Sequence, residues 1–166
     1  RLHRDCVVGG VAFIYSKIVA PGVIEHYKRG GVAIGELMGH KSERVLQIAE
    51  IFTQAGISCQ LSDDIRKSKW EKMCWNCVFN PLTVLIDDKV AKALDHPEMA
   101  GVIRQIVGEV AAVSAAVKVP LAPDMAEKVV KWTQELRDIH TSMYDDWKAN
   151  RPTEIEYLNG YIVRMG

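Results

Sequence analysis

The stretch KWEKMCWNCVFNPL, from Lys69 to Leu82, is the part of this sequence that is most informative about its fold. Lys72, Asn76 and Asn80 recur at every fourth position, and at 3.6 residues per turn each step drifts by only about 40° around a helix. The three side chains therefore form one polar stripe on an otherwise largely apolar helix. Such a stripe offers hydrogen-bond donors to an anionic or carbonyl-bearing ligand, although a solvated lysine and a helix-ending asparagine explain the same spacing.

A second group of polar residues follows about seventy positions later, with Ser142 first and the run from Thr153 to Gly160 after it. Thr153 and Glu156 have the spacing of a capping box, which predicts a helix that starts at Thr153. Glu154 would then lie in the first turn, where the helix dipole favours a carboxylate. This pattern predicts an anion of fixed direction, although taken alone it is more typical of a residue that only complements the dipole.

Taken together, these motifs resemble the C-terminal domain of the ketopantoate reductase (2-dehydropantoate 2-reductase) family. The resemblance rests on K-x-x-x-N-x-x-x-N-P-L-T from Lys72 to Thr83, S-M at Ser142, and T-E-I-E from Thr153 followed by N-G. It covers residues 60–166 well and residues 5–60 loosely, and several separated motifs in one order are a specific signal. One departure is the turn Val117-Lys118-Val119-Pro120, where the family usually has glycine.

The resemblance implies a mainly α fold. Residues 63–166 would form a helical, 6-phosphogluconate-dehydrogenase-C-terminal-like domain that binds substrate and carries the catalytic residue, with its C-terminus truncated. Residues 1–62 would be the α/β tail of an incomplete Rossmann-type NADP-binding domain. The resemblance also implies an oxidoreductase that uses NADPH to reduce ketopantoate to pantoate, in the pathway to pantothenate and coenzyme A.

The resemblance assigns a role to each of five residues. Lys72 matches the catalytic general acid that protonates the keto oxygen. Asn76, Asn80 and Ser142 match residues that hold the substrate, and Glu154 matches the carboxylate that accepts the substrate hydroxyl. The chemistry is reasonable in itself, because a carbonyl that gains hydride becomes an alkoxide, which a nearby ammonium stabilises and protonates.

The glycine-rich fingerprint of dinucleotide-binding domains, G-x-G-x-x-G, is missing from this sequence. The chain also opens on Arg1 without an initiator methionine, and the family's final helices are cut short at Gly166. We therefore expect a fragment that is inactive alone, with NADP bound only by the full-length protein and the cofactor-binding residues outside this chain. The alternatives are a non-catalytic helical dimerisation or interaction module of the same fold, and a reductase of a different 2-keto acid.

Composition limits the classes of partner. The chain has 166 residues, 48% of them hydrophobic, and 21 basic residues balance 21 acidic ones. No net field attracts nucleic acid or an anionic membrane, and no apolar stretch approaches the length of a membrane span. We expect a cytoplasmic protein that binds a small-molecule 2-keto acid but neither nucleic acid nor membrane, and that forms a possible homodimer through an open sheet edge.

The cysteines and histidines do not indicate a metal site. Cys74 and Cys77 form a C-x-x-C motif, but they lie within a predicted helix, and no second motif or ligand histidine follows. The five histidines are scattered without ligand spacing. The sequence therefore predicts buried thiols at positions 74 and 77 and no metal ion.

The remaining pattern changes from strands to helices near Ser62. Short apolar runs bounded by glycine predict buried strands, and Ile57–Leu61 alternates like a half-buried strand. Helical spacing from Ser42 to Ala55 predicts a helix capped by Ser42 and ended by Gly56. The predicted strands are Cys6–Ile14, Val23–Tyr27 and Val32–Leu37.

Helices are predicted throughout the second part. Ser62 or Asp63 would cap the helix that carries Lys72, and Pro81 would kink or end it. Pro97–Val117 is apolar on most faces and is predicted to be the central buried helix. A capping pair at Asp124 and Glu127 predicts a further helix that reaches about Ile139.

Overall fold

The structure, a computed structural model, describes residues 6–166 and divides the chain into two compact units. The sheet unit ends at Lys69, and the helical unit spans Trp70–Gly166. The predicted start of the first domain at residue 1 lies outside the described residues.

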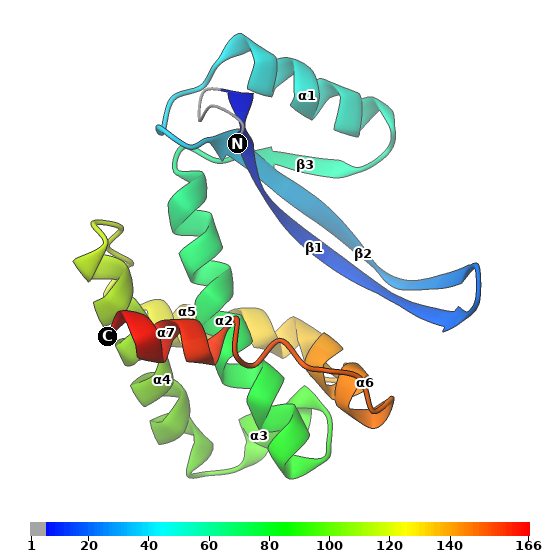
Figure 1. Ribbon diagram of the computed structural model, residues 1–166, viewed down its shortest axis with the longest axis vertical. Helices are drawn as coiled ribbons and strands as arrows, with labels where there is room; N and C mark the ends of the chain where they lie inside the picture. The colour runs from blue at the N-terminus through cyan, green and yellow to red at the C-terminus, as the bar shows by residue number, and fades with distance from the viewer. Residues whose placement is uncertain (1–5) are drawn as a thin grey trace. The chain divides into compact units, whose positions relative to one another are not determined.

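The sheet unit contains three strands in the order β1-β2-β3 (Figure 1). β1 (Val8–Ala20) pairs antiparallel with β2 (Val23–Glu36), and β2 pairs parallel with β3 (Ser58–Leu61). The helix α1 (Glu43–Gln54) connects the two parallel strands, so β2, α1 and β3 form a βαβ unit.

The cap and stop predicted for α1 are confirmed. The Ser42 hydroxyl accepts a hydrogen bond from the Val45 amide at 3.3 Å, and Gly56 has a φ of +75° just after the helix, which glycine adopts without steric cost. Val45 and Ala49 of α1 are buried together with Ile34 of β2. The half-buried strand predicted from Ile57 to Leu61 is confirmed as β3.

The strands before α1 differ from their prediction. The runs predicted at Val23–Tyr27 and Val32–Leu37 are parts of one strand, β2, which ends at Glu36, and β1 starts at Val8 and continues to Ala20. Gly30, interpreted as a strand boundary, lies inside β2 because a side chain there would meet the backbone of β1. A Cβ atom at Gly30 would lie 1.7 Å from the Phe13 carbonyl oxygen.

The outer part of this hairpin is also not buried, contrary to the prediction. Ile14 of β1 and Ile24 of β2 are 61% and 69% exposed. Apolar periodicity reports the preference for a strand, but it does not report whether a second layer covers that strand.

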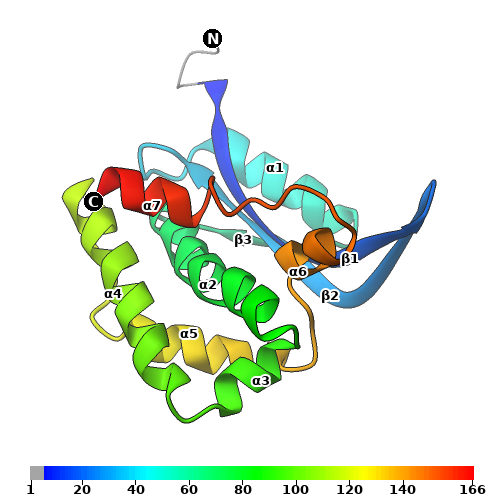
Figure 2. The same ribbon diagram turned by 60° about the horizontal axis from the view of Figure 1, so that its bottom comes forward.

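The helical unit is built around α2 (Ile65–Ile86), whose first residues belong to the sheet unit. From Trp70 onward α2 runs through the middle of the helical unit, with α4, α5 and α7 around it (Figures 1 and 2). The helices that follow α2 are α3 (Val90–Asp95), α4 (Met99–Ala116), α5 (Met125–Thr133), the short 3-10 helix η2 (Gln134–Leu136), α6 (Ser142–Lys148) and α7 (Asn159–Met165).

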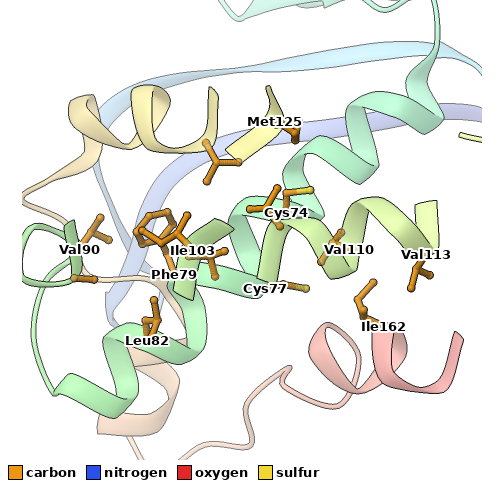
Figure 3. Close-up of a cluster of buried hydrophobic side chains, with 14 residues drawn as sticks. Cys74, Cys77, Phe79, Leu82, Val90, Ile103, Val110, Val113, Met125 and Ile162 are labelled. Carbon is orange, nitrogen blue, oxygen red and sulfur yellow. The ribbon is translucent and has the colours of Figure 1, made fainter. Parts of the chain in front are cut away.

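The core of the helical unit is a single cluster of buried side chains (Figure 3). Phe79 of α2 packs there with Val110 of α4 and Ile162 of α7. Cys74 and Cys77 are buried free cysteines within this core, as predicted. Burial raises the pKa of these thiols to about 12 and about 11, so both stay protonated and act as small apolar groups.

The predicted cap of α2 is wrong, and of the two alternatives predicted for Pro81, a kink or the end of the helix, the second is wrong. Asp64 caps the helix instead of Ser62 or Asp63, since its carboxylate accepts from the amides of Arg66 and Lys67 at 3.0 and 3.2 Å. Pro81 does not end the helix, which continues to Ile86. A proline removes one amide donor from the helix interior, and tertiary packing of Phe79 and Leu82 outweighs that loss.

α4 is not the central buried helix that the sequence predicts. Ile103, Val107 and Val110 face the core, whereas Val102 and Gly108 are exposed. By length and composition α4 could cross a membrane, contrary to the expectation that no stretch approaches that length. One such helix is weak evidence, because helices that pack into the core of soluble proteins meet the same criterion.

The last two capping predictions are also wrong. Asp124 does not cap α5 with its side chain but pairs with Lys128 at 3.0 Å, and α5 ends at Thr133 instead of Ile139. The helix predicted from Thr153 begins at Asn159, after a turn over residues 154–158.

Candidate functional site

Lys72 lies on α2 in the helical unit, and its side chain is half-buried. Burial lowers the pKa of the Lys72 ammonium, and the negative charge of Glu154 opposes this effect. Glu154 is exposed, yet it acts on Lys72 from 82 positions along the chain. The fold therefore brings the Glu154 carboxylate near enough to the Lys72 ammonium for its charge to raise the pKa of the lysine.

Asn76 and Asn80 follow Lys72 along α2 at successive helical turns. Asn76 is half-buried, and Asn80 is buried with only 3% of its surface exposed. A side-chain amide both donates and accepts hydrogen bonds, so each of the two is suited to binding a polar ligand.

Ser142 is the first residue of α6, and a hydrogen-bond relay holds this helix against α2. Thr141 caps α6 by accepting from the Tyr144 amide at 3.2 Å. Its hydroxyl lies 2.7 Å from that of Thr83, which bonds the Asn80 carbonyl at 3.1 Å. Because a carbonyl can only accept, the direction is fixed: Thr141 donates to Thr83, and Thr83 donates to Asn80.

Glu154 starts a turn instead of occupying a first helical turn, so the predicted helix-dipole role does not apply to it. Its carbonyl accepts from the amides of Tyr157 and Leu158 at 2.9 and 3.0 Å. Asn159 follows this turn, and its side-chain Nδ2 donates to the Cys77 carbonyl of α2 at 3.0 Å. The segment that carries Glu154 is thereby attached to the helix that carries Lys72.

The structure links some of the five predicted site residues to one another more directly than others. Lys72 and Glu154 are coupled through their charges, and Ser142 follows the residue that is linked to Asn80 through Thr83. Asn76 is connected to the site only through its position on α2, between Lys72 and Asn80.

Sequence reasoning missed the residues that hold these segments together. Thr83 and Asn159 belong to the quoted motifs, but no supporting role was predicted for them. Thr141 gave only the weak signal of a cap residue, with Tyr144 three positions later. Such links are formed between residues 58 or more positions apart, so local spacing does not reveal them.

The βα turn between β2 and α1 in the sheet unit carries a buried carboxylate, that of Glu36. A dinucleotide pyrophosphate binds at a helix N-terminus through free amides. At α1 the buried Glu36 carboxylate already accepts from the Ser42 hydroxyl and from Arg44 at 2.6 and 2.7 Å. These bonds lower the pKa of Glu36 to about 2, so Glu36 is an anion that forms an ion pair with Arg44.

Metal ions are not indicated by the described residues. In the range 6–166, no group of three or more His, Cys, Asp or Glu side chains is arranged to hold one. The five side chains predicted for the site offer an ammonium, a carboxylate, two amides and a hydroxyl, which are groups suited to recognising a small molecule with carbonyl, hydroxyl and carboxylate groups.

A comparison with known protein families shows to which family the chain belongs. Residues 64–166 match the family model described as the C-terminal domain of ketopantoate reductase PanE/ApbA. The chain belongs to the ketopantoate reductase family. This membership confirms the resemblance inferred from the Lys72, Ser142 and Thr153 motifs and the mainly helical fold class that it implied.

Individual relatives agree with this assignment. The chain is 30% identical, over its whole length, to a 2-dehydropantoate 2-reductase from Mesorhizobium japonicum, of which it covers 51%. A crystal structure of 2-dehydropantoate 2-reductase from Methylococcus capsulatus matches with a TM-score of 0.84 and 38% identity, over 96% of this chain and 51% of that one. D-mandelate dehydrogenase in complex with NADH matches with a TM-score of 0.89 and 27% identity, over 96% and 55% of the two chains.

These relatives are longer than this chain. It spans about half the length of the curated relatives that it matches. The fold and the family therefore follow from the comparisons, whereas the activity of a whole protein does not.

Proposed function

We propose that this chain is the substrate-binding part of a nicotinamide-dependent reductase that converts ketopantoate (2-dehydropantoate) to pantoate. The observation that carries the proposal is the electrostatic coupling of the half-buried Lys72 to Glu154. Membership of the ketopantoate reductase family supports the reaction class, and the names of the relatives support ketopantoate as the substrate.

In the proposed reaction Lys72 is the catalytic acid. When bound, the cofactor supplies the hydride that reduces the keto carbon. Lys72 gives a proton to the keto oxygen, and its ammonium stabilises the charge that develops there. Burial lowers the pKa of Lys72, which makes its proton easier to transfer near neutral pH.

The other four residues bind and orient the substrate. The amides of Asn76 and Asn80 and the hydroxyl of Ser142 hold its carboxylate and hydroxyl ends, and the Glu154 carboxylate accepts a hydrogen bond from its hydroxyl. Glu154 also favours the protonated form of Lys72 before the reaction, since its charge raises the pKa of the lysine.

We further propose that residues 1–62 are the last part of a Rossmann-type domain and that residues 63–166 form the substrate domain. The βαβ unit of β2, α1 and β3 supports the first assignment. NADP would bind outside this chain, since the α1 N-terminus is filled by Glu36 and Ser42. We also expect the protein to be cytoplasmic and to form a homodimer, because β1 lies at a sheet edge within the described residues.

A different 2-keto acid is the second candidate substrate. The match to D-mandelate dehydrogenase, with a TM-score of 0.89, favours it. That enzyme's name indicates a 2-hydroxy acid with an aromatic side chain, which a change of pocket shape around the same polar groups would admit. A non-catalytic module of this fold is the third possibility, and it would show no turnover at all.

The assay that tests the proposal uses the product of the complete reading frame that encodes this chain. Oxidation of NADPH and of NADH is followed with ketopantoate and with benzoylformate, the keto acid that corresponds to mandelate. We expect the highest kcat/KM for ketopantoate with NADPH. A preference for benzoylformate would favour the second candidate, and inactivity with every 2-keto acid would contradict the proposed function.

A further inference from the structure

Pro81 leaves one carbonyl of α2 without its helical partner. In an α-helix the carbonyl of residue i accepts from the amide of residue i+4, so Cys77 would be served by residue 81. Proline has no amide hydrogen, yet α2 continues through Pro81 to Ile86. Cys77 is buried, and a buried carbonyl needs another donor.

Asn159 supplies that donor from the other end of the helical unit. Its Nδ2 donates to the Cys77 carbonyl oxygen at 3.0 Å. A carbonyl can only accept, so the amide nitrogen must face Cys77. The Oδ1 atom is then buried, without a hydrogen-bond partner in the part of the chain that the structure describes. The side chain keeps an orientation that leaves its own oxygen unsatisfied.

We propose that Asn159 is a positioning residue that substitutes for the amide hydrogen missing at Pro81. Its bond satisfies the free carbonyl of α2 that lies between Asn76 and Asn80. The same bond attaches the loop over residues 154–158, which starts at Glu154, to this part of the helix. One hydrogen bond thus fixes the position of the segment that carries Glu154 relative to α2. The effect on catalysis rests on the proposed function, whereas the effect on α2 does not.

The link to Glu154 is short and well defined. The amides of Tyr157 and Leu158 bond the Glu154 carbonyl, and the Gly160 amide bonds the Ile155 carbonyl at 3.0 Å. The turn is therefore closed on itself by backbone bonds, and the Asn159 side chain ties it to α2. Without the hydrogen bond from Asn159 to Cys77, the whole turn could move relative to α2. This movement would weaken the electrostatic coupling of Glu154 to Lys72.

A double-mutant cycle tests the substitution directly. Pro81→Ala restores an amide hydrogen for the Cys77 carbonyl, which makes the Asn159 donor redundant. We expect Asn159→Ala to lower the folding equilibrium constant about tenfold when Pro81 is present, and about threefold or less in the Pro81→Ala background. All four tryptophans lie in the helical unit, so urea unfolding followed by tryptophan fluorescence reports on this unit.

Arg164→Ala is the matched control. Arg164 lies on the same helix, α7, and its bonds are to Glu156, so its loss should cost the same in both backgrounds. Equal costs of Asn159→Ala in both backgrounds would contradict the proposal, because a mere packing role does not depend on Pro81. If Asn159→Ala alone does not fold, recovery of folded protein in the double variant supports the proposal, and failure of both contradicts it.

The kinetic arm separates this inference from the proposed function. In the complete protein we expect Asn159→Ala to lower kcat/KM for ketopantoate about tenfold, and we expect the double variant to regain the value of Pro81→Ala within about threefold. Absence of any reductase activity would contradict the proposed function alone, since the unfolding cycle still decides the role of Asn159. Activity together with equal losses in both backgrounds would contradict the inference alone.

Discussion

At the scale of single residues, Lys72 is the group that the proposed chemistry cannot replace. We expect Lys72→Ala to lower turnover of the complete protein by about a hundredfold or more, the usual contribution of a positioned acid. The melting temperature should barely change. Lys131→Ala, which removes an exposed lysine of α5, is the control and should retain full activity. A Lys72 variant with near-normal turnover would rule out this role.

Glu154 gives a second prediction at this scale, in the pH dependence of activity. The charge of Glu154 raises the pKa of Lys72, whereas burial lowers it. In Glu154→Gln only the lowering effect remains, so Lys72 loses its proton at a lower pH. The alkaline limb of the kcat/KM profile should therefore move to lower pH. An unmoved or upward-shifted limb would show that Glu154 does not act on the catalytic acid.

The candidate site was predictable from the sequence only in part. Lys72, Asn76 and Asn80 share one helical face because four-residue spacing dictates it, and the structure has them on α2. The roles of Ser142 and Glu154 came from the family resemblance, since no local rule relates residue 154 to residue 72. The supporting bonds of Thr141 to Thr83 and of Asn159 to Cys77 exist only in the folded chain.

At the scale of the elements, the residue just after α4 has a strained backbone conformation, and a substitution can remove this strain. Lys118 has a φ of +63° just after the helix, in the left-handed region that favours glycine. Its amide donates to the Ala115 carbonyl at 2.9 Å, as in a glycine-type helix stop. We expect Lys118→Gly to stabilise the helical unit by about 0.5–1 kcal/mol. Urea unfolding followed by tryptophan fluorescence measures the change, and a loss of stability would contradict this reading of the turn.

Helix ends show where sequence patterns suffice and where they fail. The Ser42 cap of α1 was predictable, because the cap residue and the apolar face are adjacent in the chain. Asp64 caps α2 although Ser62 and Asp63 have similar propensity, since the Ser62 amide bonds Ile34 of β2 and extends the sheet by one residue. Thr153 has a suitable partner in Glu156, but that glutamate instead bonds Arg164 of α7. Competing tertiary partners decided both cases.

The strands before α1 were misread for a related reason. Gly30 and Gly31 look like a break in the chain, yet both lie within β2, where neighbouring backbone leaves no room for side chains. A Cβ at Gly31 would lie 2.7 Å from the Ser58 carbonyl oxygen. Glycine at a close approach between strands and glycine at a turn are identical in sequence, and only the pairing partners distinguish them.

At the scale of the whole molecule, the division of labour between the two units can be tested with the chain itself. The α1 N-terminus is filled by Glu36 and Ser42, so we expect the chain to bind neither NADPH nor NADP with micromolar affinity. Isothermal titration calorimetry on the 166-residue chain measures this. Micromolar binding would show that the sheet unit holds the cofactor by a route other than a βα turn.

The central claim is that Lys72, Asn76, Asn80, Ser142 and Glu154 form one substrate site. A keto acid is small, so groups that bind it together must place their polar atoms within roughly 10 Å of one another.

The position of ketopantoate in a crystal structure of the complete protein tests this claim most directly. We predict the keto oxygen at about 3 Å from Lys72 Nζ, the hydroxyl at Glu154, and the carboxylate among Asn76, Asn80 and Ser142. Ketopantoate bound elsewhere, with Glu154 turned away from Lys72, would contradict the account and leave only the fold and the family.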